Sequence, residues 1–153
     1  MAVFKKILVA TDFGEASAAA LDYGRELAAT FGATLQLLHV VGNVISQHAS
    51  EFVFAAYPEV QAQVEDAAGK ALNSLLNEED RHTLRATTIL RTSTAPAVAI
   101  VQCAAEEHVD LIIMGTHGRG MVGHLIAGSV AERVVRSAGC PVLTVRARPA
   151  EVG

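Results

Sequence analysis

The sequence predicts one α/β domain built on a doubly wound, five-stranded parallel sheet with helices on both faces. Short apolar runs alternate along the chain with longer segments of helical periodicity. Runs that are apolar at nearly every position are typical of strands buried on both faces of a parallel sheet. The chain has 153 residues, 51% hydrophobic and 18% charged, which fits one globular domain. We expect this domain over residues 1–147 and a short tail over 148–153.

Five apolar runs mark the expected strands. They cover residues 7–10, 35–41, 84–90, 111–114 and 142–145. Helical patterns separate them, and right-handed crossovers would place those helices on both faces of the sheet. In such sheets ligands bind beyond the carboxyl ends of the strands, near the point where the strand order reverses. We therefore expect a site among the turns that follow the strands.

The expected helices fill the gaps between these runs. The first ends at Gly32, a residue suited to a helix C-cap. The third opens near Pro96, and the fourth follows Gly128 and Ser129. The second covers about residues 58–77, and its spacing predicts a core face made of Val60, Val64, Ala67, Ala71 and Leu75. Residues 42–57 could form a loop, an extension of the helix or a lid over a ligand, and we favour a segment that packs on the domain over a lid.

Charge, cysteine content and hydropathy argue against several classes of protein. The net charge is −4, and the only lysines are Lys5, Lys6 and Lys70, so we expect no nucleic-acid partner. Cys103 and Cys140 are too few and too far apart for a disulfide framework or a zinc site. The sequence shows neither a secretory signal nor the roughly 18 unbroken apolar residues of a membrane span. We expect a soluble cytoplasmic protein that does not bind membranes.

A glycine-rich segment follows the fourth expected strand. Five of the twelve glycines fall within residues 115–128. Glycines let the backbone turn tightly and bring its N–H groups close to a ligand. A helix that starts after Gly128 and Ser129 adds free amides and the positive end of its dipole. Together these features are typical of a phosphate site.

Two nucleotide motifs fit this segment only in part. Gly118-x-Gly120-x-x-Gly123 has the spacing of the dinucleotide fingerprint, but it follows the fourth strand, and no later strand supplies the ribose-binding acid. Gly123-x4-Gly128-Ser129 resembles a P-loop that lacks its lysine. Ordinary P-loop phosphoryl transfer is therefore disfavoured.

A second candidate position is Thr11-Asp12, directly after the first strand. A carboxylate there would point into the binding crevice, where it could bind a ribose hydroxyl or a metal-bound water. Asp12 could equally cap the first helix, and the two roles are compatible. His117 is the histidine placed to meet a phosphate, whereas His39 lies in a strand and is expected in the core. No Ser/His/Asp or Cys/His set is legible, so we assign no catalytic residue.

The pattern as a whole resembles the ATP-binding branch of the universal stress protein family. The hallmark of that branch, G-x2-G-x9-G-[S/T], reads Gly115-x2-Gly118-x9-Gly128-Ser129 here. Residues 7–13, 38–40 and 140–146 are similar to the family's opening strand and acid, its second strand and its closing strand. The resemblance runs from about residue 6 to residue 146. It implies a Rossmann-like fold of the adenine nucleotide alpha hydrolase type.

The resemblance also implies a ligand, which is ATP with Mg²⁺ or Mn²⁺. Thr11 and Asp12 would face the ribose, Val40 would meet the adenine, and Met114 and Gly115 would flank the sugar and base. The phosphates would be held, largely through backbone amides, by Gly118, Gly128, Ser129 and Val130. The metal would be held mainly by the phosphates, with Asp12 a candidate contact through water. The nucleotide-binding residues implied in this way are Ala10, Thr11, Asp12, Val40, Met114, Gly115, His117, Gly118, Arg119, Gly128, Ser129 and Val130.

Proteins of this type usually form homodimers through their last strand. Here that implies an interface through Val142, Leu143, Thr144 and Val145, which would close an exposed sheet edge. Two positions depart from the family pattern: Gly14 stands where many relatives have serine, and Thr94 where many have glycine.

The implied function is a nucleotide-sensing or nucleotide-storing module that acts in the stress response. Two alternatives stay open. One is a slow ATPase or nucleotidyl-transferring enzyme on the same fold, and the other is an interaction protein with an empty pocket.

Overall fold

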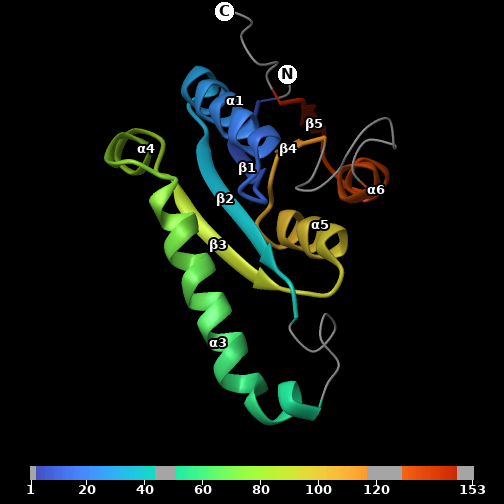
Figure 1. Ribbon diagram of the computed structural model, residues 1–153. Coiled ribbons are helices and arrows are strands. Elements are labelled where there is room, and N and C mark those ends of the chain that lie inside the picture. Colours follow the sequence, from blue (N-terminus) through green and yellow to red (C-terminus); the bar gives the residue numbers. More distant parts are fainter. Residues whose placement is uncertain (1–2, 44–50, 117–128, 148–153) are drawn as a thin grey trace, which may run out of the picture.

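The computed structural model describes the chain over residues 3–43, 51–116 and 129–147. This part forms a five-stranded, all-parallel sheet with helices on both faces (Figure 1), which confirms the predicted fold class. The strands are β1 (Lys6–Ala10), β2 (Thr34–Val41), β3 (Thr87–Thr92), β4 (Leu111–Gly115) and β5 (Val142–Val145).

The strand order is β3-β2-β1-β4-β5. The chain therefore winds outward from β1 through β2 to β3, then returns to the other side of β1 for β4 and β5. This order makes the gap between β1 and β4 the switch point of the sheet. In the register of the central strands, Ala10 pairs with Leu38 on one side and with Met114 on the other.

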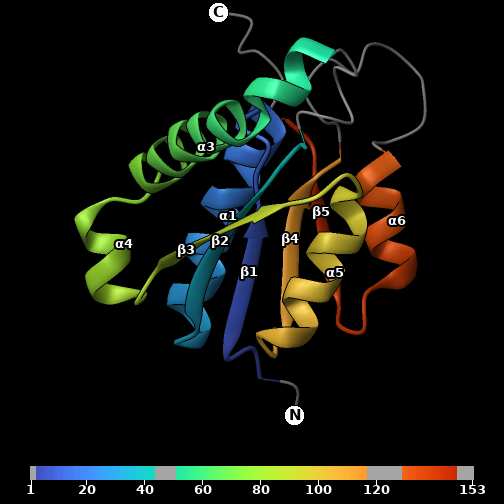
Figure 2. The same ribbon diagram turned by 90° about the horizontal axis from the view of Figure 1, so that it is seen from below.

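The helices divide between the two faces of the sheet. Helices α1 (Glu15–Phe31), α3 (Glu51–Ser74) and α4 (Glu78–Thr83) lie on one side, and α5 (Pro96–Glu106) and α6 (Ser129–Ser137) lie on the other (Figures 1 and 2). Each face has its own apolar cluster, and the side chains of β1 alternate between them: Ile7 and Val9 belong to the first cluster and Leu8 to the second. None of the helices among the described residues has the length and apolar character needed to cross a membrane.

The boundaries of α1 follow from its sequence. Gly32 has a φ of 65° and its N–H bonds the carbonyl of Ala28, which confirms the predicted C-cap. The inner face of the helix is lined by small side chains, so α1 lies close to the sheet. A Cβ on Gly24 would lie 2.5 Å from Val9 Cγ2.

The second predicted helix differs from α3 in its limits and in its buried face. Helix α3 begins at Glu51 rather than near residue 58, and it ends at Ser74. Leu72 is 1% exposed, whereas the predicted core residue Val64 is 39% exposed, and Ala67 and Ala71 are exposed as well. The face is therefore rotated by about one residue from the prediction. Its alanines give a weak apolar pattern, and the large side chain of Leu72 decides which side packs on the sheet.

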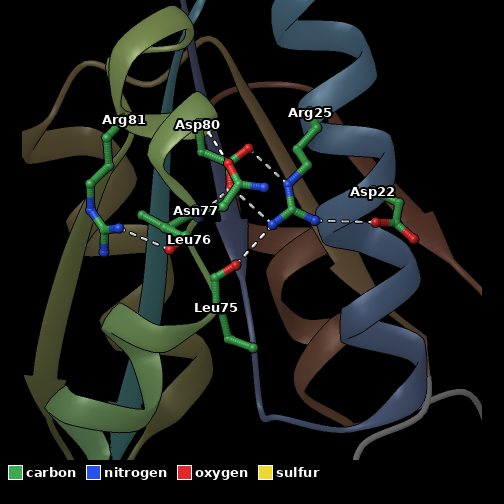
Figure 3. Close-up of polar contacts among 7 residues, drawn as sticks. All are labelled: Asp22, Arg25, Leu75, Leu76, Asn77, Asp80 and Arg81. Atoms are coloured by element: carbon green, nitrogen blue, oxygen red, sulfur yellow. Dashed lines mark hydrogen bonds and ion pairs between the residues drawn. The ribbon is translucent and has the colours of Figure 1, made fainter.

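Helix α4 was not predicted from the sequence. Because it continues to Thr83, the third strand begins at Thr87 rather than at Leu84. Asn77 and Asp80 form a capping box: Asn77 Oδ1 accepts from Asp80 N at 2.8 Å, and Asp80 Oδ2 accepts from Asn77 N at 2.9 Å. Asp80 is buried, at 3% exposure, and receives two hydrogen bonds of 2.9 Å from Arg25 on α1 (Figure 3). Arg25 also donates to the Leu75 carbonyl at 2.8 Å, so one guanidinium joins α1 to the end of α3 and to α4.

Candidate functional site

The carboxyl ends of β1 and β4 meet at the switch point, where the sequence predicts a ligand. Thr11 and Asp12 follow β1, and Met114 and Gly115 close β4. Thr11 N donates to the Leu38 carbonyl at 2.8 Å, which extends the pairing between β1 and β2 by one residue. The structure thus brings the predicted ribose-side residues next to the predicted residues of β4.

Four of the predicted site residues lie on the face of the sheet that α5 and α6 cover. Ala10 and Met114 belong to the apolar cluster of that face, and Val40 and Val130 pack against it. They come from β1, β4, β2 and α6, which are far apart in sequence. Ala10 and Met114 are 8% and 5% exposed, so the partly buried Val40 and Val130 offer the apolar area that suits the flat face of a base.

The turn between β1 and α1 fixes the Asp12 carboxylate. Asp12 Oδ1 accepts a hydrogen bond from Gly14 N at 2.8 Å, and Ser17 Oγ lies 2.9 Å from the same oxygen. The N-cap position of α1 is occupied by Gly14. The prediction that Asp12 is the N-cap residue is therefore wrong. Asp12 instead binds the residue at the cap and the side chain of Ser17 in the first turn.

Thr11 is more enclosed than a ligand-facing side chain would be. It is 7% exposed, and its hydroxyl accepts from Phe13 N at 3.0 Å and donates to Ser17 Oγ at 3.0 Å. The Thr11 hydroxyl is therefore part of the internal structure of the turn. Its predicted contact with the ribose stays a prediction.

His39 joins β2 to the same turn from the side of α1. Its Nδ1 lies 2.7 Å from the Thr11 carbonyl oxygen, so Nδ1 carries a proton and donates it, since a carbonyl can only accept. The His39 ring packs on Phe13 with centroids 4.4 Å apart. Phe13 has a φ of 66°, a conformation that costs a non-glycine residue about 1 kcal/mol or more. His39 is half-buried and hydrogen-bonded at the rim of the core rather than enclosed in it.

Gly115 is required by packing at this edge. A Cβ at this position would lie 2.7 Å from Ala16 Cβ and 3.0 Å from Ser17 N. These atoms belong to the first turn of α1 and cannot rotate away as the end of a long side chain could. Gly115 therefore lets β4 end directly against the start of α1.

The amino-terminal half of α3 is tied to the neighbouring strand ends. Gln61 Nε2 contacts Glu65 Oε1 at 3.0 Å and the Gly42 carbonyl at 3.4 Å. Thr92, at the end of β3, donates to Glu65 Oε1 at 3.0 Å. Residues 51–57 continue this helix, and residues 44–50 lie outside the described residues.

The titratable groups described in the structure do not form a catalytic set. Among the described residues, no three histidine, cysteine, aspartate or glutamate side chains gather as a metal site would require. Burial raises the pKa of the Cys103 thiol, against the opposing effect of Arg91, and burial also raises the pKa of Cys140. Both thiols are therefore protonated near neutral pH and are weak nucleophiles.

Several predicted residues lie outside the described residues: His117, Gly118, Arg119 and Gly128. Ser129 begins α6, as predicted. Sequence reasoning missed Ser17 and the contact between His39 and Thr11. A serine in the first turn of a helix gives no distinctive signal, and only its burial reveals that it belongs to the site.

Comparisons with known proteins place the chain in a family. The profile of the universal stress protein family matches residues 4–146. A universal stress protein of Thermus aquaticus is 34% identical over 146 residues, which are 94% of this chain and 100% of that protein. The universal stress protein YxiE of Bacillus subtilis is 32% identical over 149 residues, with 94% and 100% of the two chains covered.

Solved structures agree with this relationship. The MJ0577 protein of Methanocaldococcus jannaschii superposes with a TM-score of 0.80 at 27% identity, over 97% of this chain and 99% of that chain. UspA of Lactobacillus plantarum shares the fold, with a TM-score of 0.76 at 23% identity over 95% of this chain and 100% of that chain. The present chain belongs to the universal stress protein family.

Proposed function

We propose that this universal stress protein binds an adenine nucleotide, with ATP as the leading ligand, at the switch point between β1 and β4. The strand order supports this proposal most directly. It brings Asp12, the predicted ribose-side acid, beside Met114 and Gly115 at the one edge where sheets of this type bind ligands.

The residues present fit the chemical groups of a nucleotide. The apolar surface of Val40 and Val130 suits a base, and the carboxylate of Asp12 suits a ribose hydroxyl. The amino terminus of α6, preceded in sequence by Gly128, suits phosphate oxygens. A divalent cation would be held mainly by the phosphates, since the described residues offer it one nearby carboxylate rather than a cluster.

A sensing or storage role accounts for these features better than turnover. His39, the histidine that the described residues bring to this edge, uses Nδ1 to hold the Thr11 carbonyl. Asp12 is engaged by Gly14 and Ser17. Both groups therefore stabilise the turn, and the hydroxyl that contacts Asp12, that of Ser17, is 3% exposed and so is not open to a ligand. A slow ATPase is the alternative, and ADP formation with Mg²⁺ would identify it.

Edge pairing through β5 would make the protein a homodimer. Strand β5 is an edge of the sheet, its Leu143 is 36% exposed, and Thr144 is exposed as well. An unpaired edge presents a row of N–H and C=O groups to another strand. A second copy of β5 would satisfy these groups and cover Leu143.

Native mass spectrometry of freshly purified protein tests the nucleotide and the assembly together. We expect a dimer that carries one adenine nucleotide per chain, and calorimetry should show binding of added Mg-ATP by the stripped protein. ADP, AMP and cAMP serve as competitors, because a universal stress protein of the same fold was solved in complex with cAMP. A protein that arrives without nucleotide and ignores all four ligands would favour the interaction-protein alternative.

Substitutions in the glycine motif locate the site. Gly118→Val and Gly128→Val should each abolish nucleotide binding, because a branched side chain would occupy space intended for phosphate. Their circular dichroism spectra should match that of the wild type. Normal ATP binding by Gly128→Val would show that the site lies elsewhere.

A further inference from the structure

We propose that Ser17 is a positioning residue of the nucleotide site, which sets the direction of the Asp12 carboxylate through a directed chain of hydrogen bonds. This inference rests on the proposed function, because it takes Asp12 to be the group that meets the ribose. Ser17 itself would touch no ligand.

The chain of hydrogen bonds has one consistent direction. Phe13 N donates to Thr11 Oγ1 at 3.0 Å, so the Thr11 proton is available to Ser17 Oγ at 3.0 Å. Ser17 then has one proton to give, and two acceptors lie at 2.9 Å: Asp12 Oδ1 and the Gly14 carbonyl. The carboxylate is charged and is the stronger acceptor. Successive donors in such a chain polarise one another and strengthen the last bond.

Burial protects these hydrogen bonds from competition with water. Ser17 is 3% exposed and Thr11 is 7% exposed. Because both hydroxyls are shielded from solvent, water cannot replace a lost partner, and Ser17 would be left with the Gly14 carbonyl if Asp12 moved. The half-buried carboxylate thus receives a hydrogen bond from the interior of the protein.

Gly14 confines the same oxygen from the other side. Its N–H lies 2.8 Å from Asp12 Oδ1, and a Cβ at position 14 would lie 2.9 Å from that oxygen. The absence of a side chain at Gly14 therefore allows the carboxylate to turn back toward α1 and reach Ser17.

The consequence for binding is a carboxylate held in place before the ligand arrives. Pre-organised groups bind more tightly because less freedom is lost on association. We expect Ser17→Ala to weaken ATP binding about tenfold, the effect of one lost hydrogen bond to a charged group. The loss should depend on the ribose hydroxyls, because those are the groups that Asp12 would contact.

Calorimetric titration of the full chain separates this role from a general structural one. The probes are Mg-ATP and Mg-2′,3′-dideoxy-ATP, and the proteins are the wild type, Ser17→Ala, Asp12→Ala and the double variant. We expect Ser17→Ala to weaken ATP but not the dideoxy analogue, and to add nothing in the Asp12→Ala background. Equal losses for both ligands, or an undiminished affinity for ATP, would overturn the inference. A wild type that binds neither probe would instead refute the proposed function.

Two further variants complete the test. Ser74→Ala is the matched control: its hydroxyl donates to the Ala71 carbonyl, three residues back, at 2.7 Å on the exposed side of α3 and has no part in the Asp12 turn. It should bind both probes like the wild type. If Ser17→Ala does not fold, Ser17→Cys replaces the hydroxyl with a weaker donor at nearly constant volume, and it should also give a ribose-dependent loss.

Discussion

Single residues at the switch point are constrained by their neighbours as much as by a ligand. Gly115 shows this clearly, since the first turn of α1 occupies the space where a side chain would be. The glycine motif of the sequence therefore combines two requirements. Its first glycine allows two elements to touch, and the later ones are those that we propose bind the phosphates.

Gly115→Ala tests the packing requirement. The added methyl group would overlap Ala16 and the backbone of Ser17, so we expect a loss of about 2 kcal/mol in the free energy of unfolding. Urea denaturation measures it. Gly139→Ala is the control, because nothing lies within 4 Å of the point that its Cβ would occupy, and it should change stability little. Equal stability of the two variants would show that α1 can shift away from β4.

His39 is a second constraint at this scale. Its Nδ1–H bonds the Thr11 carbonyl, and the side-chain amide of asparagine can place a donor at nearly the same point. We therefore expect His39→Leu to lower the melting temperature by several degrees, from the loss of about 1 kcal/mol, and His39→Asn to recover part of that loss. Differential scanning calorimetry compares them, and identical melting temperatures for both variants would mean that ring packing alone matters.

At the scale of elements, α4 depends on an ion pair that spans 55 residues of sequence. Burial alone would raise the pKa of Asp80, but the hydrogen bonds from Arg25 and from the Asn77 amide outweigh it and leave that pKa below its ordinary value. The side chain of Asp80 is 5% exposed and that of Arg25 is 29% exposed. Removing the Asp80 carboxylate would leave Asp22, at 3.3 Å on the exposed side, as the acidic partner of Arg25, and would remove one half of the capping box as well.

We expect Asp80→Asn to cost about 3 kcal/mol of unfolding free energy near neutral pH. A carboxyl whose pKa is lowered by folding adds stability that is fully present above its unfolded-state pKa. That contribution is kept down to about pH 4 and lost as the pH falls through the lower pKa of the folded state. Stability curves of the wild type and Asp80→Asn should therefore converge in acid.

Asp66→Asn is the matched control for this measurement. Asp66 pairs with Lys70 at 3.0 Å, but both side chains are well exposed, at 67% and 79%. Its loss should stay within about 0.5 kcal/mol at every pH. A comparable loss in both variants would mean that the burial of Asp80 adds nothing.

The sequence predicts elements well where the signal is local. Four strands were recognisable from nearly unbroken apolar runs and the third from alternation, although that strand begins at Thr87 rather than at Leu84. The carboxyl-edge position of Asp12 followed from the first strand. Helix α4 was missed because its six residues rest on a capping box and on Arg25, a partner that no local pattern reveals. The buried face of α3 was misplaced because alanines pack equally well on either side.

The candidate site, like the fold, could be predicted from the sequence only in part. Asp12 was placed at the carboxyl edge by the end of the first strand, and Met114 was added by the family resemblance. The register pairs Ala10 with Met114, which brings the end of β4 near the turn that holds Asp12. Their contact with a ligand stays a prediction. Ser17 could not be placed from the sequence, because its role depends on burial beneath Thr11 and on the missing side chain of Gly14. Sequence motifs suggested the residues that we propose bind the ligand. The residue that we propose orients Asp12 could be recognised only from the structure.

At the scale of the whole molecule, the sheet has two edges, β3 and β5. We expect Thr144→Asp to dissociate the proposed dimer, because a charge in the middle of a paired edge strand is hard to bury. Light scattering should then report a monomer. Thr87→Asp places the same charge on β3, the opposite edge, and should leave the mass unchanged. Dissociation by Thr87→Asp alone would assign the interface to β3 instead.

The left-handed conformation of Phe13 has a consequence for the order in which the molecule assembles. The turn after β1 runs against the local preference of its own residue and is held by His39 from β2. It can therefore take its final shape only after those two strands have paired. A fluorescent nucleotide added during refolding should report capture later than circular dichroism reports secondary structure. Binding competence would be among the last properties that the chain acquires.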